Sequence, residues 1–362
     1  MKKRNLLLAL VGSALLLTGC KGGSSEKPAA QKSFGFGSLA KYAATRADNE
    51  FDIETTVDYV AVVLEADVIK NLRLDTVQLY AKIAEEAIVL KTETNGDVKS
   101  KWELLDGYGM KVASPIEKEW YEQAEAFENW AVGKTVAEVK AGMTGTKLTD
   151  GATIGNTIHV NAWVAALEDA VLNKVTFEGE VKGLGVGGVN AVSKDRATGV
   201  VEGQDWTIGG AVFTEGKKVL AARIDTFQVR YENSEGKAVI KSGLKQVDYD
   251  NKRVKGKQEL KEEYGMKVAS PIEKEWYEQA ASLVEYIKGK TVSEALGTAA
   301  KLANGAEVGC TMNIGGYRTA LLEAEHTAFN SRKYNPSMKD ICCLNSLANP
   351  SGNPTLDLRI KV

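Results

Sequence analysis

The chain has 362 residues, of which 46 are Lys or Arg and 48 are Asp or Glu. This nearly neutral balance offers no electrostatic basis for nucleic-acid binding. A content of 44% apolar and 26% charged residues excludes a fully disordered chain, and the length suits about two domains. The four cysteines are too few for a disulfide framework, and with two histidines they provide no zinc-binding spacing. We therefore expect neither a nucleic-acid partner nor a metal site.

The first 20 residues have the pattern of a secretory signal. A basic start is followed by an apolar stretch from Leu6 to Leu17, and the segment ends in Leu-Thr-Gly-Cys at Cys20, which resembles the bacterial lipobox. We predict a lipoprotein signal peptide over residues 1–20, with lipidation of Cys20. Residues 21–36 are mostly small and polar, which predicts a flexible tether. The expected location is the cell membrane, lipid-anchored on its extracytoplasmic face.

The main organisational feature is an internal repeat. The 17 residues YGMKVASPIEKEWYEQA occur at Tyr108–Ala124 and again at Tyr264–Ala280, at an offset of 156. Flanking segments also match, including RLDTVQ from Arg73 with RIDTFQ from Arg223. This similarity predicts two homologous repeats, 37–174 and 175–328, followed by an irregular C-terminal tail over 329–362.

Strand patterns come first in each repeat. Residues 55–62 and 221–229 alternate between apolar and polar, with many β-branched or aromatic side chains, which predicts strands. Residues 233–236 predict a hairpin turn. The Gly-rich segment 183–188 contains G-x-G-x-x-G but no helix pattern follows it, so we interpret it as a flexible join between the repeats rather than as a dinucleotide site.

Helix patterns follow the strands. Ser114, Pro115 and Glu117 resemble a capped helix start, and the next residues form one apolar stripe up to Gly133. A second helix is predicted from Thr135, and a third over 161–174. The predicted fold class is therefore α+β, as two homologous tandem domains, each with a β-rich N-terminal part followed by helices.

A short Gly-rich segment lies between the last two predicted helices of each repeat. Residues 148–158 and 302–312 share the pattern L-x-x-G-A-x-[IV]-G-x-T-[IM]. The hydroxyl present in both copies belongs to Thr157 and Thr311, whereas Thr153 is replaced by Glu307.

Together, the leader, the doubled domain, the GMKVASPIEKEWYEQA segment and the Thr loop resemble one family. It is the extracellular FMN-binding lipoproteins of flavin-based extracellular electron transfer in Gram-positive bacteria, of the pheromone-precursor type. The resemblance covers residues 1–328 and implies FMN joined by a phosphoester to Thr157 and Thr311, up to one per repeat. Thr153, in an Asp-Gly-Ala-Thr sequence, is the alternative acceptor.

The resemblance also implies partners and a role. A flavin transferase would attach the FMN, and a membrane quinol or NADH oxidoreductase would supply electrons that pass to extracellular acceptors. In this role the chain is an electron-transfer flavoprotein rather than an enzyme with its own substrate. The alternative is a non-enzymatic surface lipoprotein that binds a ligand or partner without covalent flavin.

Three other features have simpler interpretations. The Trp residues of the repeated WYEQA segments are expected in the core, although they could also stack on a ring-shaped ligand. Arg73 with Asp75, and Arg223 with Asp225, are expected to form structural pairs, with contact to flavin as the alternative. His159 is expected to face solvent from a strand.

Overall fold

The computed structural model describes residues 31–93 and 96–330. The described residues mix helices and antiparallel strands, which confirms the α+β class. Cys20, Cys342 and Cys343, with the predicted signal peptide and nearly all of the tail, lie outside the described residues. From residue 31 onward the described chain forms one compact unit, to which both repeats belong.

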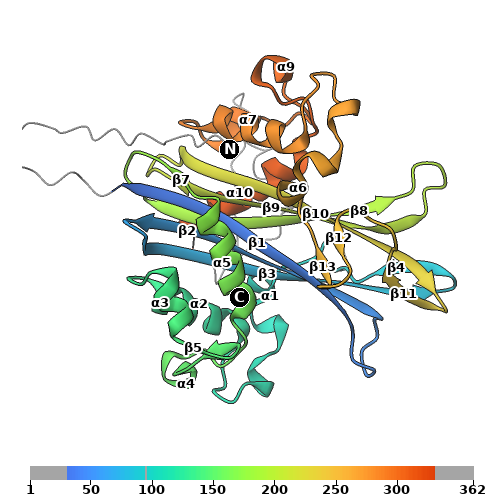
Figure 1. The fold of residues 1–362 in the computed structure, drawn as a ribbon, viewed down its shortest axis with the longest axis horizontal. Helices are drawn as coiled ribbons and strands as arrows, with labels where there is room; N and C mark the ends of the chain where they lie inside the picture. The colour runs from blue at the N-terminus through green and yellow to red at the C-terminus, as the bar shows by residue number, and fades with distance from the viewer. Residues whose placement is uncertain (1–30, 94–95, 331–362) are drawn as a thin grey trace, which may run out of the picture. The chain divides into compact units, whose positions relative to one another are not determined.

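The first repeat builds an antiparallel sheet and then a group of helices (Figure 1). The strands, in sheet order, are β1 (Lys32–Ala44), β2 (Ile53–Glu65), β3 (Val68–Ala84) and β4 (Ala87–Leu90). The α-helices are α1 (Lys101–Leu104), α2 (Trp120–Ala131), α3 (Val136–Ala141), α4 (Gly151–Ile154) and α5 (Asn161–Leu172). The 3-10 turns η1 (Leu105–Tyr108) and η2 (Lys111–Ala113) lie between α1 and α2, and the small hairpin β5 (Met143–Thr144) with β6 (Lys147–Leu148) precedes α4.

The main strands and helices of the second repeat follow the same order as those of the first. Its strands are β8 (Gly183–Lys194), β9 (Val201–Phe213), β10 (Val219–Ser234) and β11 (Lys237–Ile240). The 3-10 turns η3 (Lys261–Tyr264) and η4 (Lys267–Ala269) accompany the α-helices α6 (Lys257–Leu260), α7 (Trp276–Ile287), α8 (Val292–Leu296), α9 (Gly305–Val308) and α10 (Gly315–Phe329).

Short strands also tie the second repeat to the first sheet. Strand β13 (Arg253–Val254), paired with β12 (Val247–Asp248), adds to the free edge of β1 through Ala40 and Val254. The linking strand β7 (Val175–Thr176) pairs with β1 farther along, at Ser33 and Phe34. The two repeats are therefore joined by backbone hydrogen bonds as well as by side-chain packing.

The sheets of the two repeats share a hydrophobic core, and each has helices on its other face (Figure 1). On β2, Val57, Tyr59 and Ala61 face the other sheet, whereas Val60 and Val62 face the helices of the first repeat. Both faces of β2 are thus covered, so burial is nearly continuous even though the side chains alternate in direction.

Glycines let the last helix of each repeat lie directly on a strand. A Cβ at Gly37 would be 2.3 Å from the carbonyl oxygen of Ala166 on α5, and a Cβ at Gly185 would be 1.7 Å from that of Ala324 on α10. The segment 183–188 is therefore the start of strand β8 rather than a flexible join between the repeats. Its glycines are required by close helix packing, a long-range contact that local composition does not reveal.

The predicted start of the first repeat also needs correction. Strand β1 begins at Lys32, so residues 32–36, which were assigned to the tether, belong to the sheet. Phe34 and Phe36 are buried in the core between the sheets. Phe34 and Phe36 alternate with small residues as in a strand, but the small and polar residues before them led to the prediction of a tether.

The helix predicted to start near Ser114 begins later, at Trp120. The backbone of Glu117 has a left-handed φ of 51°, which interrupts a helix, and the capping box is formed by Glu119 and Glu122. The apolar stripe is confirmed, since Trp120, Ala124 and the two residues that follow in register are all buried. The helices from Thr135 and Asn161, the strands at 55–62 and 221–229 and the turn at 233–236 are also confirmed.

Gly185→Ala should destabilise the fold, because its new Cβ would overlap the α10 backbone. We expect a loss of about 1–3 kcal/mol or more in the free energy of unfolding, measured by urea denaturation. Gly107→Ala is the matched control, since its Cβ would meet nothing within 4 Å. Equal stabilities for the two variants would contradict this packing argument.

Candidate functional site

The two Thr loops have the same geometry. Each begins with a single helical turn, α4 or α9, and ends at a glycine in the left-handed conformation, Gly155 at φ 94° and Gly309 at φ 83°. The glycine that starts each turn is needed for a different reason. A Cβ at Gly151 would be 2.2 Å from the carbonyl oxygen of Asn156, and a Cβ at Gly305 would be 2.4 Å from that of Cys310. The shared glycines therefore specify a compact loop that presents the following Thr.

A buried glutamine holds each Thr. The Thr157 backbone N–H donates to Gln123 Oε1 at 2.9 Å, and its hydroxyl lies 3.3 Å from the same oxygen. Thr311 makes the same two contacts to Gln279 Oε1, at 2.8 Å and 3.3 Å. Because both glutamines are fully buried, they fix the position of the Thr side chains.

The glutamines are positioned by the repeated 17-residue segment. Gln123 Nε2 donates to Ser114 Oγ and to the Lys118 carbonyl oxygen, both at 3.1 Å. Gln279 Nε2 donates to Ser270 Oγ at 2.9 Å in the same way. The Ser114 hydroxyl therefore accepts a hydrogen bond from the glutamine side chain and does not cap a helix. The identical segment and the Thr loop, which are separate motifs in the sequence, form one structure.

A cavity of about 450 Å³ opens beside Thr157. It lies between the helix-facing side of β2 and β3 and the helices of the first repeat. Its lining combines two buried indoles, Trp120 and Trp163, with polar groups. The polar side chains in the lining include those of Thr56, Asp58, Thr76, Gln78, Lys101, Ser114, Gln123 and Asn161. The volume and the mixed lining suit a planar organic ligand.

The charged groups of this cavity come from opposite walls. Asp58 on β2 accepts hydrogen bonds from Thr76 Oγ1 at 2.6 Å and from Trp163 Nε1 at 3.1 Å. Burial raises the pKa of Asp58 above its ordinary value, although the hydrogen bond from Thr76, the charge of Lys101 and the hydrogen bond from Trp163 oppose the shift. Lys101 is also buried, with its ammonium 4.6 Å from the Tyr108 ring centre and 5.6 Å from that of Trp120.

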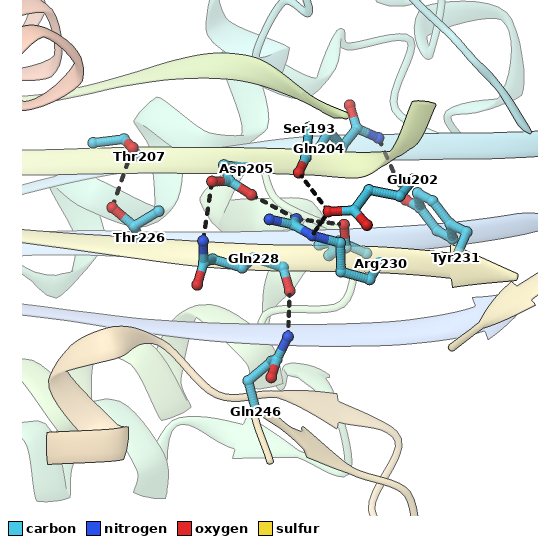
Figure 2. Close-up of polar contacts among 11 residues, drawn as sticks. Ser193, Glu202, Gln204, Asp205, Thr207, Thr226, Gln228, Arg230, Tyr231 and Gln246 are labelled. Carbon is cyan, nitrogen blue, oxygen red and sulfur yellow. Dashed lines mark hydrogen bonds and ion pairs between the residues drawn. The ribbon is translucent and has the colours of Figure 1, made fainter. Parts of the chain in front are cut away.

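The second repeat reproduces the aromatic and cationic part of this arrangement. Lys257 lies 4.7 Å from the Tyr264 ring centre and 5.7 Å from that of Trp276. Tyr317 replaces Trp163, and its hydroxyl accepts a hydrogen bond from Trp276 Nε1 at 2.8 Å. At the position of Asp58 the second repeat has Thr207, which is hydrogen-bonded to Thr226 at 3.1 Å (Figure 2).

The remaining candidate residues of the loops have different surroundings. Thr153 is exposed on α4 and does not line the cavity. His159 is exposed, as expected, but it lies in a loop rather than in a strand, lines the cavity and contacts the Thr146 hydroxyl at 2.5 Å. Cys310 is fully buried, and burial raises the pKa of its thiol to about 11, so it is a poor nucleophile. Asn156, its counterpart, anchors the loop by donating to the Gln123 carbonyl oxygen at 2.9 Å.

The expected Arg–Asp pairs do not form. Arg73 binds Glu128 on α2 at 3.1 Å, and Asp75 instead accepts hydrogen bonds from backbone N–H groups and from the Tyr59 hydroxyl. Arg223 and Asp225 line a separate cavity of about 610 Å³ between the repeats, together with residues of β1 and α5. Neither arginine lines the cavity beside Thr157. The i, i+2 spacing places each pair on one strand face, where Asp225 accepts hydrogen bonds from the backbone N–H groups of Gln258 and Thr226.

Several residues of the candidate site were missed in the sequence analysis. Gln123 lies in the repeated 17-residue segment but was not singled out there, whereas Lys101 and Asp58 belong to no motif and lie far from Thr157 in the chain. The exact repetition of Gln at position 279 and of Lys at position 257 was the available signal. Asp58 had no such signal, because it does not recur in the second repeat.

Within residues 31–93 and 96–330, no group of three or more His, Cys, Asp or Glu side chains is arranged to hold a metal ion. None of the helices in this part of the chain is long and apolar enough to cross a membrane.

Comparisons with known proteins give one partial match. No protein-family model matches the chain, and no solved structure matches it significantly. Among curated proteins, a chlorophenol reductase from Desulfitobacterium hafniense is 31% identical over 125 residues. The match covers 31% of this chain and 38% of the relative, so the chain spans well under half of the relative's length.

The inter-repeat cavity generates a pH prediction. Burial raises the pKa of Asp225 from its ordinary 3.8 to about 6, although the N–H groups of Gln258 and Thr226 donate to its carboxylate. A raised pKa means that the folded chain binds this proton more tightly than the unfolded chain. The stabilisation is therefore complete below about pH 4 and is lost as the pH rises through about 6.

We expect the stability difference between wild type and Asp225→Asn to change by on the order of 2–3 kcal/mol between pH 4 and pH 7. Urea denaturation at both pH values measures this difference. Asp250→Asn, at an exposed position, is the control substitution. Parallel pH profiles for wild type and Asp225→Asn would be inconsistent with the assignment.

Proposed function

We propose that the chain is a membrane-anchored extracytoplasmic electron carrier that holds FMN through phosphoester bonds to Thr157 and Thr311. Electrons would come from a membrane quinol or NADH oxidoreductase and pass to extracellular acceptors. The observation that carries the proposal is the duplicated arrangement of a glycine-bounded Thr, a buried Gln clamp, a Lys and a Trp. This arrangement adds to the family resemblance of the leader and the Thr loop.

The residues around Thr157 fit a flavin. The cavity of about 450 Å³ lies next to the hydroxyl that would carry the phosphate, so a ring tethered there has a space to enter. Trp120 and Trp163 supply apolar walls, and Gln78, Asn161 and Lys101 supply polar groups for the edge of a ring. When bound, flavin would supply the redox chemistry, and the chain would supply its orientation and electrostatic surroundings.

The chain's own residues have separable tasks in this proposal. Gln123 and Gln279 orient the acceptor Thr before modification, since each accepts hydrogen bonds from the Thr backbone and hydroxyl. The exposed α4 and α9 turns leave one side of each loop open to a flavin transferase. In the attachment step the transferase would take the FMN phosphoryl group from FAD: the Thr oxygen would bond to phosphorus, the FAD pyrophosphate bond would break with release of AMP, and the hydroxyl proton would be lost. The covalent bond would prevent loss of the cofactor to the medium.

The second candidate function is a surface lipoprotein that binds a ligand or partner without a covalent bond. The cavity beside Thr157 favours this candidate as well, because its aromatic walls and polar groups could hold a free ring compound. The partly matching relative is named as a chlorophenol reductase, which is compatible with a redox role. The match covers only a segment of this chain.

Mass spectrometry separates the two candidates. Purified protein, co-expressed with a flavin transferase, should carry up to two covalent FMN groups. Thr157→Val and Thr311→Val should each remove one, because the hydroxyl oxygen that forms the ester is lost. Thr153→Val is the control, since this Thr is exposed on α4 and is expected to leave the flavin content unchanged.

A protein without covalent flavin would contradict the proposed carrier and support non-covalent binding if a ligand is removed by dialysis. Loss of flavin in Thr153→Val, with retention in Thr157→Val, would move the first attachment site to Thr153.

A further inference from the structure

The two candidate flavin sites share most of their residues. Both have the buried Lys over aromatic rings, the Trp at the start of the long helix, the clamping Gln and the Ser that holds this Gln. Any difference between the sites must therefore come from the residues that do not recur. Several of those residues lie on the two strands that form the floor of the site.

Equivalent strand pairs supply six helix-facing positions in each repeat. In the first repeat the cross-strand pairs are Glu54–Tyr80, Thr56–Gln78 and Asp58–Thr76. In the second repeat the corresponding pairs are Gly203–Arg230, Asp205–Gln228 and Thr207–Thr226. We call these six positions the strand floor. The first floor has two acidic residues and no basic residue, whereas the second has one of each.

Of the two acids of the first floor, Asp58 lines the cavity, and both acids accept hydrogen bonds from neutral donors. Asp58 lines the cavity and receives its hydrogen bonds from Thr76 and Trp163. Glu54 accepts from Gln78 Nε2 at 2.7 Å and from the Thr56 hydroxyl. The lining contains two lysines, the buried Lys101 and the exposed Lys147. The first floor together with its buried lysine has a formal charge of −1.

The acid of the second floor is paired with a base. Asp205 binds Arg230 at 2.6 Å and also accepts from Gln228 Nε2 at 3.2 Å (Figure 2). The same guanidinium contacts Glu202, also on β9, at 3.2 Å (Figure 2). With Lys257 added, the formal charge of the second floor and its lysine is +1, and Glu202 reduces it to zero. In either count the second site is more positive than the first.

We infer that the strand floors give the two flavin sites unequal reduction potentials, with Asp58 holding the site of the first repeat at the lower potential. This inference rests on the proposed function. Reduction adds negative charge to a flavin, so a nearby carboxylate disfavours it and a nearby cation favours it. The effect is strong here because Asp58 is only 7% exposed and is poorly screened by solvent. Electrons that enter the chain would therefore collect at the second repeat.

Single-site proteins test the inference. Thr311→Val leaves the first site and Thr157→Val leaves the second, and spectroelectrochemical titration gives the midpoint potential of each. We expect a lower potential for the first site. Asp58→Asn should raise that potential, because it removes the charge while its amide oxygen still accepts from Thr76 and Trp163.

Glu54→Gln provides a second test of the first floor if Asp58→Asn fails to fold, and should also raise the potential. Glu168→Gln is the control, since this acid lies on α5, is paired with Lys140 and is not part of the strand floor. It should leave the potential unchanged.

The outcomes separate this inference from the proposed function. Absence of covalent flavin from the mass spectrum would refute the proposed function itself. Bound flavin with equal potentials at the two sites, or a first-site potential unaffected by Asp58→Asn and Glu54→Gln, would overturn the inference alone. The expected order of potentials, with an upward shift in Asp58→Asn, would support both.

Discussion

Face-to-face packing of the two sheets is the constraint on which the rest of this structure depends. Each sheet would expose an apolar face if its repeat were alone, and the other repeat covers that face. The fit is close. A Cβ added to Gly210 of the second repeat would be only 2.3 Å from the ring of Phe36 in the first repeat. The edge pairing of β13 with β1 adds hydrogen bonds to this packing. The repeats are thus homologous in sequence but share one core.

This arrangement leaves the opposite faces of the two sheets for the helices, and the candidate sites lie there. The strand floor, the long helix and the Thr loop of each repeat meet on the side away from the shared core. The site residues can therefore diverge between repeats without disturbing the packing between the sheets. Asp58 and Thr207 are an example, since they occupy the same position in the two sheets but give their sites different charges.

The sequence analysis predicted much of the local structure correctly. It failed where the local conformation depends on contacts with residues far away in the chain. Alternation predicted the strands around 55–62 and 221–229, because half of a strand's side chains face a core wherever that core lies. Ser114 looked like a helix cap, because Ser-Pro-x-Glu is a local pattern. In the folded chain the Gln123 side chain donates to its hydroxyl, and the backbone of Glu117 is left-handed. The glycines of 183–188 were interpreted as a flexible join. They are required because α10, more than a hundred residues later in the chain, packs directly on this strand.

The sequence by itself determined the duplication, the α+β order of elements and the two Thr residues that recur in equivalent loops, because these features are local or repeated. Only the tertiary structure decided that the repeats share a core, that one Gln clamps each Thr and that Asp58 meets Trp163 across 105 residues of chain. Such contacts depend on how sheets and helices pack. A single sequence indicates such contacts only where both repeats have the same residue, and the second repeat has Thr207 at the position of Asp58.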